Sequence, residues 1–142
     1  MSAAVAKTSR DYRCYRISPN DTNRLAIIFD LVGEAVDFIC TVEIFDVGGK
    51  TPPNMHPIGQ EMFYALAGEA TATCDGKTVV LRPGDSLLVR PGAEHVIENT
   101  GHGRFYCLQV MVPNDQFAEL IRNGTPAALD DEDLAVLGRI AR

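Results

Sequence analysis

The sequence lacks the features that mark several common functional classes. It has 13 Lys and Arg against 19 Asp and Glu, a formal net charge of −6, and its basic residues are scattered rather than gathered into a run. The absence of a basic patch argues against a nucleic-acid partner and against binding to an anionic membrane surface. No apolar run approaches the ~20 residues that a membrane-spanning helix needs.

Cysteine is also scarce, and its four positions form no C-x-x-C pair: Cys14, Cys40, Cys74 and Cys107. The first residues, "MSAAVAKTSRDYRC", contain no apolar core of signal-peptide length. We therefore expect a cytoplasmic protein whose cysteines are reduced and mostly buried. A chain of 142 residues can bury a sizeable core without disulfides, so we expect one domain over residues 1–142.

Short β-rich segments separated by turn signals fill the chain from about residue 12 to residue 112. Residues 38–45 alternate, with Phe38, Cys40, Val42 and Ile44 on one face and Ile39, Thr41, Glu43 and Phe45 on the other. Further strands are expected at 12–18, 24–33, 61–67, 69–74, 77–81, 86–90, 95–99 and 104–112. Asp75-Gly76 is a strong hairpin signal. The pattern predicts an all-β sandwich or barrel, and no helical pattern is evident before residue 113.

The tail changes character and predicts two short helices over residues 114–142. Asn114 can cap the first, whose apolar positions are Phe117, Leu120 and Ile121 and whose stop is Asn123-Gly124. Asp130 is a good N-cap for the second, with Leu129 and Leu134 placed as a hydrophobic staple. Leu134, Leu137 and Ile140 form a stripe expected to lie against the barrel. The acidic run "DDED" is explained by helix capping rather than by a cation site.

Two of the three histidines fall where a barrel would bring them to a carboxylate. His56 precedes Glu61 by five residues, and His95 begins a later strand. Inward residues of a small barrel face one interior, so these three can converge in an apolar cavity lined by Phe63, Ala65, Ile97 and either Val42 or Ile44. His102 lies in a glycine-rich turn and is expected to be exposed. Glu43 and Glu98 are expected to point outward. A pocket role for Cys40, Gln109 or Asn99 stays open.

Two motifs resemble those of the cupin superfamily. The first, G(X)5HXH(X)3,4E(X)6G, is matched by Gly48, His56, Glu61 and Gly68, except that Asn54 replaces the first histidine. The second, G(X)5PXG(X)2H(X)3N, is matched with Arg90 in place of its first proline, at Gly84, Pro91, Gly92, His95 and Asn99. Flanking segments extend the resemblance over most of residues 12–112.

The resemblance implies a double-stranded β-helix, a jelly-roll barrel, with a short C-terminal helical tail. It also implies one divalent transition metal ion, with Fe favoured over Mn, Ni, Co or Zn, held by His56, Glu61 and His95. Asn54 is the departure from the motif: its amide can be a weak fourth ligand, can hydrogen-bond a metal-bound water, or can do neither. Two histidines and one carboxylate form the donor set of many non-haem Fe(II) oxygenases.

The resemblance therefore favours an Fe(II)-type dioxygenase acting on a small oxygenated organic molecule, as in the loosely similar quercetinase-like cupins, where Glu61 would also act as a catalytic base. Two alternatives stay open, a metal-assisted isomerase or lyase and a non-catalytic binding or sensing module. We also expect a homodimer, because "YRCYRIS" near the N-terminus is suited to pair with the sheet edge of a second copy.

Overall fold

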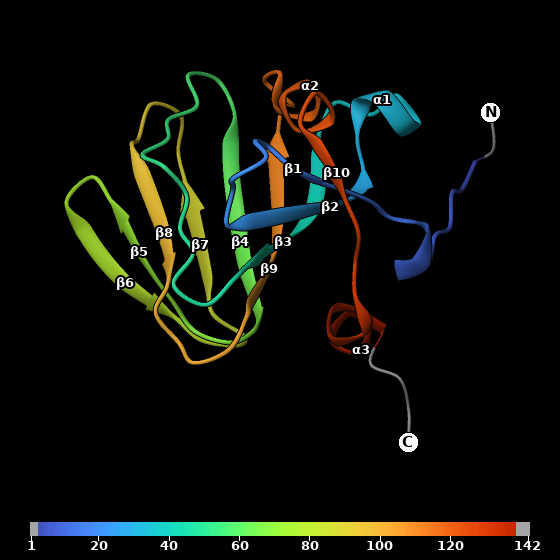
Figure 1. Cartoon of the computed structure of the whole chain (residues 1–142). Coiled ribbons are helices and arrows are strands. Elements are labelled where there is room, and N and C mark those ends of the chain that lie inside the picture. Colours follow the sequence, from blue (N-terminus) through green and yellow to red (C-terminus); the bar gives the residue numbers. More distant parts are fainter. Residues whose placement is uncertain (1–2, 139–142) are drawn as a thin grey trace.

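The strands of the protein follow one another with few helical interruptions. The structure is a computed structural model that describes residues 3–138. Its elements are a 3-10 helix (Ser9–Asp11), β1 (Arg13–Arg16), β2 (Asn23–Phe29), α1 (Leu31–Glu34), β3 (Ile39–Phe45), β4 (Gln60–Ala67), β5 (Ala70–Cys74), β6 (Lys77–Leu81), β7 (Ser86–Val89), β8 (His95–Asn99), β9 (Phe105–Val112), α2 (Phe117–Arg122), β10 (Thr125–Ala127) and α3 (Asp131–Gly138) (Figure 1).

The strands form two antiparallel sheets that face each other. The large sheet has the order β10-β1-β2-β3-β9-β4-β7, and the small sheet has the order β6-β5-β8. Sequence neighbours are often not sheet neighbours: β9 lies between β3 and β4, and β8 pairs with β5. This arrangement is a jelly-roll β-sandwich, and it confirms the all-β fold expected from the sequence. Figure 1 shows the small sheet on one side, with α3 beyond the opposite side of the large sheet.

The turns fall where the sequence places them. Asp75 and Gly76 close the β5–β6 hairpin with positive φ angles of 50° and 77°. Glycine adopts this conformation without a steric cost, and aspartate tolerates it better than most residues. All nine expected strand segments are present, and eight of them lie within one or two residues of their expected limits. The exception is 24–33, where β2 ends at Phe29.

The face assignment of β3 differs in part from expectation. Thr41, Glu43 and Phe45 lie on the inner face, whereas Val42 and Ile44 pack on the outer face with Cys14, Ala26 and Tyr106. The expectations that Glu43 points into solvent and that Val42 or Ile44 lines the cavity are therefore wrong. The physical reason is that both faces of β3 are covered, because residues 127–137 pack over its outer side.

The sequence patterns do not predict two short elements, α1 and β10. The helix α1 follows β2 directly, and Asp30 caps it by accepting a hydrogen bond from the Gly33 N–H at 2.9 Å. One helical turn is too short to show a periodicity, so the expectation of no helix before residue 113 is wrong here. β10 pairs with the edge of β1. Because β2 lies on the other side of β1, that strand is paired on both edges and cannot recruit the sheet of a second copy.

Both expected helices of the tail are present, but Leu120 is 50% exposed, whereas Phe117 and Ile121 are buried as expected. The helix α2 ends at the C-cap Asn123, and the Asn114 amide oxygen accepts the Ala118 N–H at 2.8 Å near its start. Asp130 accepts the Asp133 N–H at 3.0 Å and caps α3. Leu129 and Leu137 pack on the outer face of the large sheet. Ile140 lies outside the described residues. Asp133 does more than favour a helix terminus, because it is buried and paired with Arg24.

The four cysteines are free thiols, with Cys14 and Cys107 buried and the other two half-buried. The expectation of mostly buried cysteines therefore holds for two of the four. Within residues 3–138, the helices are all too short to traverse a lipid bilayer.

Candidate metal centre

Both sheets and one loop supply the candidate ligands. Glu61 is the second residue of β4 in the large sheet, His95 is the first residue of β8 in the small sheet, and His56 lies in the loop before β4. Backbone hydrogen bonds fix that loop to the small sheet: Asn54 and His95 exchange two, at 3.1 and 2.8 Å, and the Gly92 N–H donates to the His56 carbonyl at 2.8 Å. The site therefore depends on the closure of the sandwich.

The three side chains converge on one point. One ligand atom from each of His56, Glu61 and His95 lies within 4.8 Å of the other two. Glu61 Oε1 is 3.0 Å from His95 Nε2 and 3.2 Å from His56 Nε2. Two adjacent ligands on an octahedral ion at about 2.1 Å would lie about 3.0 Å apart, so these separations fit a shared divalent transition metal.

The tautomer of His95 suits a ligand role. Its Nδ1 lies 3.1 Å from the carbonyl oxygen of Ala93, which can only accept a hydrogen bond. Nδ1 therefore carries a proton and donates it, which leaves Nε2, 3.0 Å from Glu61 Oε1, as the nitrogen that would give up its proton to bind an ion.

A buried amide fixes the other oxygen of Glu61. Gln109 Nε2 donates to Glu61 Oε2 at 2.8 Å, and Thr41 Oγ1 donates to Gln109 Oε1, also at 2.8 Å. Glu61 Oε1 is left to face both histidines. Thr41 and Gln109 are cross-strand neighbours on β3 and β9, and both are fully buried. The sequence left the role of Gln109 open and offered no signal for Thr41, whose place is visible only once β3 and β9 are paired.

The electrostatics of the cluster favour ionised Glu61. Burial acts to raise the pKa of Glu61, but hydrogen bonds from His56 and His95 outweigh it and the pKa is lowered. Burial acts to lower the pKa of His95, but the contacts with Glu61 and with the Ala93 carbonyl leave it raised. His95 thus supplies a positive partner for the buried carboxylate, a role that a metal ion can also fill.

Asn54 lies at the edge of the cluster. Its Nδ2 is 3.4 Å from His56 Nε2. The Asn54 amide therefore lies next to a candidate ligand, as the motif resemblance implies. The His56 ring also contacts Phe117 of α2 edge-on, with ring centroids 5.4 Å apart, and Phe63 lies 6.3 Å from the His95 ring. One side of the cluster is therefore aromatic, and α2 covers part of it.

Glu43 is a second carboxyl inside the sandwich. It is only 6% exposed, and its Oε2 accepts a hydrogen bond from Asn23 Nδ2 at 3.0 Å. Burial, and then the negative charge of Glu61, raise the pKa of Glu43 to about 8. Its cross-strand neighbour Cys107 has a pKa raised well above the usual thiol value by burial and by both carboxylates, so it is a neutral thiol.

The remaining candidates lie away from the cluster. Asn99 is buried, but its amide donates to the backbone carbonyls of Phe45, Asp46 and Gly103 and holds a loop. Cys40 pairs with Val110 in the outward-facing set of β3 and β9. His102 and Glu98 are exposed, as expected.

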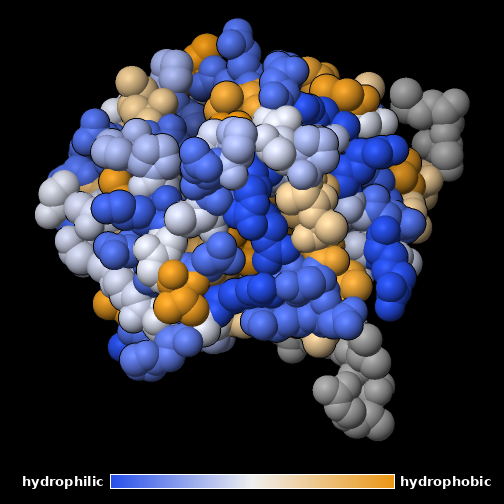
Figure 2. Space-filling model, in the orientation of Figure 1, coloured by the Kyte–Doolittle hydropathy of each residue, from blue (hydrophilic) through white to orange (hydrophobic). Residues whose placement is uncertain are grey.

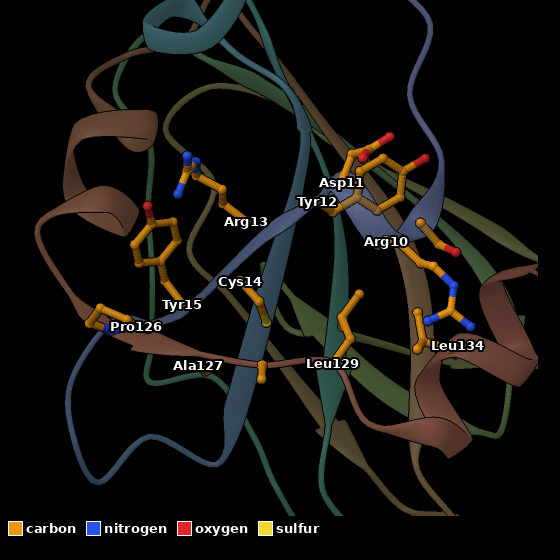
Figure 3. A pocket seen from close by; sticks show the side chains of 12 residues that line it. Arg10, Asp11, Tyr12, Arg13, Cys14, Tyr15, Pro126, Ala127, Leu129 and Leu134 are labelled. Carbon is orange, nitrogen blue, oxygen red and sulfur yellow. The ribbon is translucent and has the colours of Figure 1, made fainter.

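A groove of about 600 Å³ runs outside β1 and β10, between the N-terminal residues and α3. In Figure 3, Tyr15 lies beside Pro126 at one end, and Arg10 lies beside Leu134 at the other. The groove shares no lining residue with the candidate metal centre. On the molecular face seen in Figure 2, hydrophobic side chains are scattered among hydrophilic ones.

Comparisons with known proteins agree with the fold. A family model described as "Cupin domain" matches residues 41–111, which contain all three candidate ligands. The uncharacterized protein MJ1618 of Methanocaldococcus jannaschii is 34% identical over 102 residues, covering 69% of this chain and 78% of that protein.

Solved structures show the same fold at low sequence identity. A predicted oxalate decarboxylase from Thermotoga maritima aligns with a TM-score of 0.69 and 23% identity, covering 77% of this chain and 99% of the other. An RmlC-like cupin from Shewanella frigidimarina aligns with a TM-score of 0.64 and 18% identity, covering 78% of this chain and 92% of the other. At these identities the likeness concerns the fold alone.

Proposed function

The chain belongs to the cupin family, and we propose that it is a metal-dependent enzyme that acts on a small oxygenated organic molecule. In its iron form we expect it to be a dioxygenase. The observation that carries the proposal is the convergence of His56, Glu61 and His95, with ligand atoms within 4.8 Å of one another. Two histidines and one carboxylate leave about three positions of an octahedral ion open for substrate, water or O2.

The charge of the site defines the class of substrate. A divalent ion, one carboxylate and two neutral imidazoles sum to a net charge near +1, although the whole chain carries −6. An anionic group, or paired oxygens of an enol or hydroxy-ketone, is suited to such a centre. Phe63 and Phe117 supply apolar contacts beside the histidines, which favours an aliphatic or aromatic body on the molecule.

The chain's own residues have separable roles. His56 and His95 would hold the ion through Nε2, and Glu61 would hold it through Oε1. Gln109 keeps Glu61 Oε2 occupied, so the carboxylate cannot rotate away from the histidines without breaking that bond. Asn54 would contact the ion or a ligand bound to it. When bound, the ion would supply a Lewis acid and, if it is iron, a centre that reacts with O2. A substrate proton released on binding would move to Glu61, the ionised carboxylate of the cluster.

A second candidate is a metal-assisted isomerase or lyase, and the interior position of Glu43 favours it. Glu61 has a lowered pKa and Glu43 a raised one, so one interior carboxyl is ionised and the other protonated near neutral pH. Two carboxyls whose pKa values are pushed apart are typical of acid–base pairs. Such proton-transfer chemistry needs no O2.

The first experiment measures metal by elemental analysis of protein purified without chelators. We expect close to one transition metal ion per chain in the wild type, and a higher melting temperature with the ion than without it, because a ligand of the folded state stabilises it. His56→Ala and His95→Ala should lose the ion while circular dichroism remains that of a β protein. His102→Ala, at the exposed histidine, is the matched control and should keep it. A wild type that takes up no Fe(II), Mn(II) or Zn(II) contradicts the proposal.

The second experiment distinguishes the two reactions. The Fe(II)-loaded protein is incubated with flavonols, catechols and β-diketones while O2 uptake and product are followed. O2 uptake coupled to product supports the dioxygenase. Equal conversion under strict anaerobiosis supports the isomerase or lyase instead. A metal-loaded protein that binds these molecules and converts none of them would be a binding module.

A further inference from the structure

The groove outside β1 and β10 has the size of a small-molecule site. Its volume of about 600 Å³ lies within the range of roughly 300–1,000 Å³ that ligand pockets occupy. β10 pairs with β1 only as far as Cys14, opposite Ala127, and the chain then leaves the sheet toward α3. This departure leaves open space beside the first residues of β1, between the N-terminal 3-10 helix and α3.

The floor and the walls of the groove are largely apolar. Cys14, Leu129 and Leu134 line it, and only Cys14 is fully covered, so the two leucines keep apolar surface in contact with water. Tyr12 and Tyr15 are half-buried lining residues. In Figure 3, Cys14 and Leu129 lie in the middle of the groove. A ligand with an apolar body would remove this surface from water, which favours binding.

Two arginines beside the groove have no partner in the protein. Arg10 and Arg13 both line it and are exposed, and within residues 3–138 their side chains make no hydrogen bond or ion pair. Asp11 is the other charged residue of the lining, but its Oδ2 accepts the Thr8 N–H at 2.8 Å. The charges of the lining therefore sum to +1, although the chain carries −6.

The acidic start of α3 does not cancel this positive charge. Asp130 pairs with Arg104 at 2.8 Å, and Asp133 pairs with Arg24, so both carboxylates are already occupied. Neither of these aspartates lines the groove. Arg122 is likewise paired, with a carboxylate at 2.7 Å. Two unpaired guanidiniums beside one apolar hollow thus provide what a negatively charged ligand requires.

We propose that this groove is a second binding site, which takes a small organic anion with a carboxylate head and a narrow apolar body. Arg10 lies beside Leu134 at one end, and Arg13 extends on the side of Tyr15 (Figure 3). A guanidinium matches the geometry of a carboxylate, so a head group held by either arginine places the body along the floor at Leu129. The site is independent of the proposed enzymatic function, because it shares no lining residue with the metal cluster.

The test is an NMR titration of the 15N-labelled full chain with decanoate, below the concentration at which micelles form. We expect shift changes concentrated in the backbone amides of residues 9–15 and 127–134. The titration uses the metal-free protein and is repeated with Zn(II), so that a carboxylate bound at an ion is seen as separate changes at Glu61 and His95. Changes confined to those residues, changes elsewhere, or no change at all would overturn the proposal.

Substitution of the arginines tests the role of charge. Because either guanidinium can hold the head group, the decisive variant carries both Arg10→Gln and Arg13→Gln. It should raise the dissociation constant of decanoate at least about fivefold, and the exposed positions of both residues leave the fold intact. Arg90→Gln removes an exposed arginine outside the groove and is the matched control, which should bind as the wild type does. Equal affinities for the double variant and the control contradict the proposal.

The length of the ligand tests the role of the apolar floor. A fully buried methylene strengthens binding by about fourfold, and decanoate has four more methylenes than hexanoate. Decanoate should therefore bind at least about tenfold more tightly than hexanoate, even where part of its chain stays in water. Equal affinities for the two carboxylates would show that the apolar floor takes no part in binding, and the proposed class of ligand would be wrong.

Discussion

The two oxygens of the Glu61 carboxylate have different partners, and this division organises the candidate centre. Oε1 faces both histidines, and Oε2 accepts a hydrogen bond from Gln109. A carboxylate held at one oxygen presents the other in a fixed direction, which is what a metal site of defined geometry needs. Thr41 in turn fixes the Gln109 amide, so the carboxylate is oriented by residues of two neighbouring strands.

Asn54 is the residue at which a change should improve metal binding. Its amide lies beside His56, and an amide oxygen is a weak, hard donor compared with imidazole. Asn54→His should therefore complete a four-ligand set and tighten Zn(II) or Co(II) binding by at least about tenfold, roughly 1.4 kcal/mol. A competition titration with a chromophoric chelator measures the affinity. Met55→His, at the adjacent exposed residue, is the control for merely adding a histidine, and equal affinities for wild type and Asn54→His would mean that position 54 does not reach the ion.

Glu43 should make the stability of the metal-free protein fall as pH rises. Its pKa is raised from 4.5 to about 8, so between these values the unfolded chain has lost a proton that the folded chain keeps. Protonated Glu43 thus makes its full contribution to the free energy of unfolding below about pH 4.5. That contribution is lost progressively as pH rises to about 8, with a slope of at most about 1.4 kcal/mol per pH unit.

Glu43→Gln should remove that slope, because glutamine keeps the shape of the side chain without an ionisable group. Urea unfolding at pH 5 and pH 8 measures the free energy of unfolding of both proteins. Relative to the wild type, the variant should be more stable at pH 8 than at pH 5. Glu98→Gln, at an exposed position, should leave the slope unchanged. The buried placement of Glu43 would be refuted by an unaltered slope in Glu43→Gln.

At the scale of elements, ion pairs position the short helices: one joins α3 to the large sheet, and another joins the start of α1 to α2. Asp133 of α3 is fully buried and pairs with Arg24 of β2 through two hydrogen bonds, and it also accepts from the Tyr106 hydroxyl at 2.7 Å. Asp30, at the start of α1, accepts two hydrogen bonds from Arg122 of α2, at 2.7 and 2.9 Å. Each pair joins residues distant in sequence, so the position of each helix is set by charge as well as by apolar contact.

Asp133→Asn should therefore destabilise the fold strongly, by about 3–5 kcal/mol, because Arg24 would remain buried without its counter-ion. Burial acts to raise the pKa of Asp133, but hydrogen bonds from Arg24, the Asp130 N–H and Tyr106 lower it to about 2. Its contribution is present above about pH 3.8 and is lost as pH falls through about 2. Chemical denaturation at pH 7 measures the loss. Asp131→Asn, exposed in the same helical turn, is the control, and a comparable small effect of both changes would contradict the role of the pair.

At the scale of the whole molecule, the candidate metal centre is a property of the closed sandwich. Glu61 belongs to the large sheet, His95 to the small sheet and His56 to a loop hydrogen-bonded to the small sheet. No single element carries two of the three ligands within the described residues. An ion bound there would cross-link the two sheets.

Much of this molecule was predictable from local chemistry in the chain. Alternating apolar residues and regular turn signals predict the strands, because a pleated strand places successive side chains on opposite faces. The motif resemblance singled out His56, Glu61, His95 and Asn54 by their spacing, and the structure brings all four side chains together. That these residues bind metal stays a prediction.

The tertiary structure decided which strand faces point inward and which distant residues meet, and the spacing of residues along the chain shows neither. Alternation divides β3 into two sets but does not say which set faces the interior, so Glu43 and Val42 were assigned to the wrong sides. Thr41 and Gln109 are 68 residues apart, and only the pairing of β3 with β9 joins them to each other and to Glu61. The pairing of β10 with β1, which leaves β1 without a free edge, was equally hidden. Sequence by itself determined the local conformations and the donor atoms, because these depend on neighbours along the chain. The inner face, the support of the carboxylate and the free surfaces depend on which distant segments meet, and the fold alone determines that.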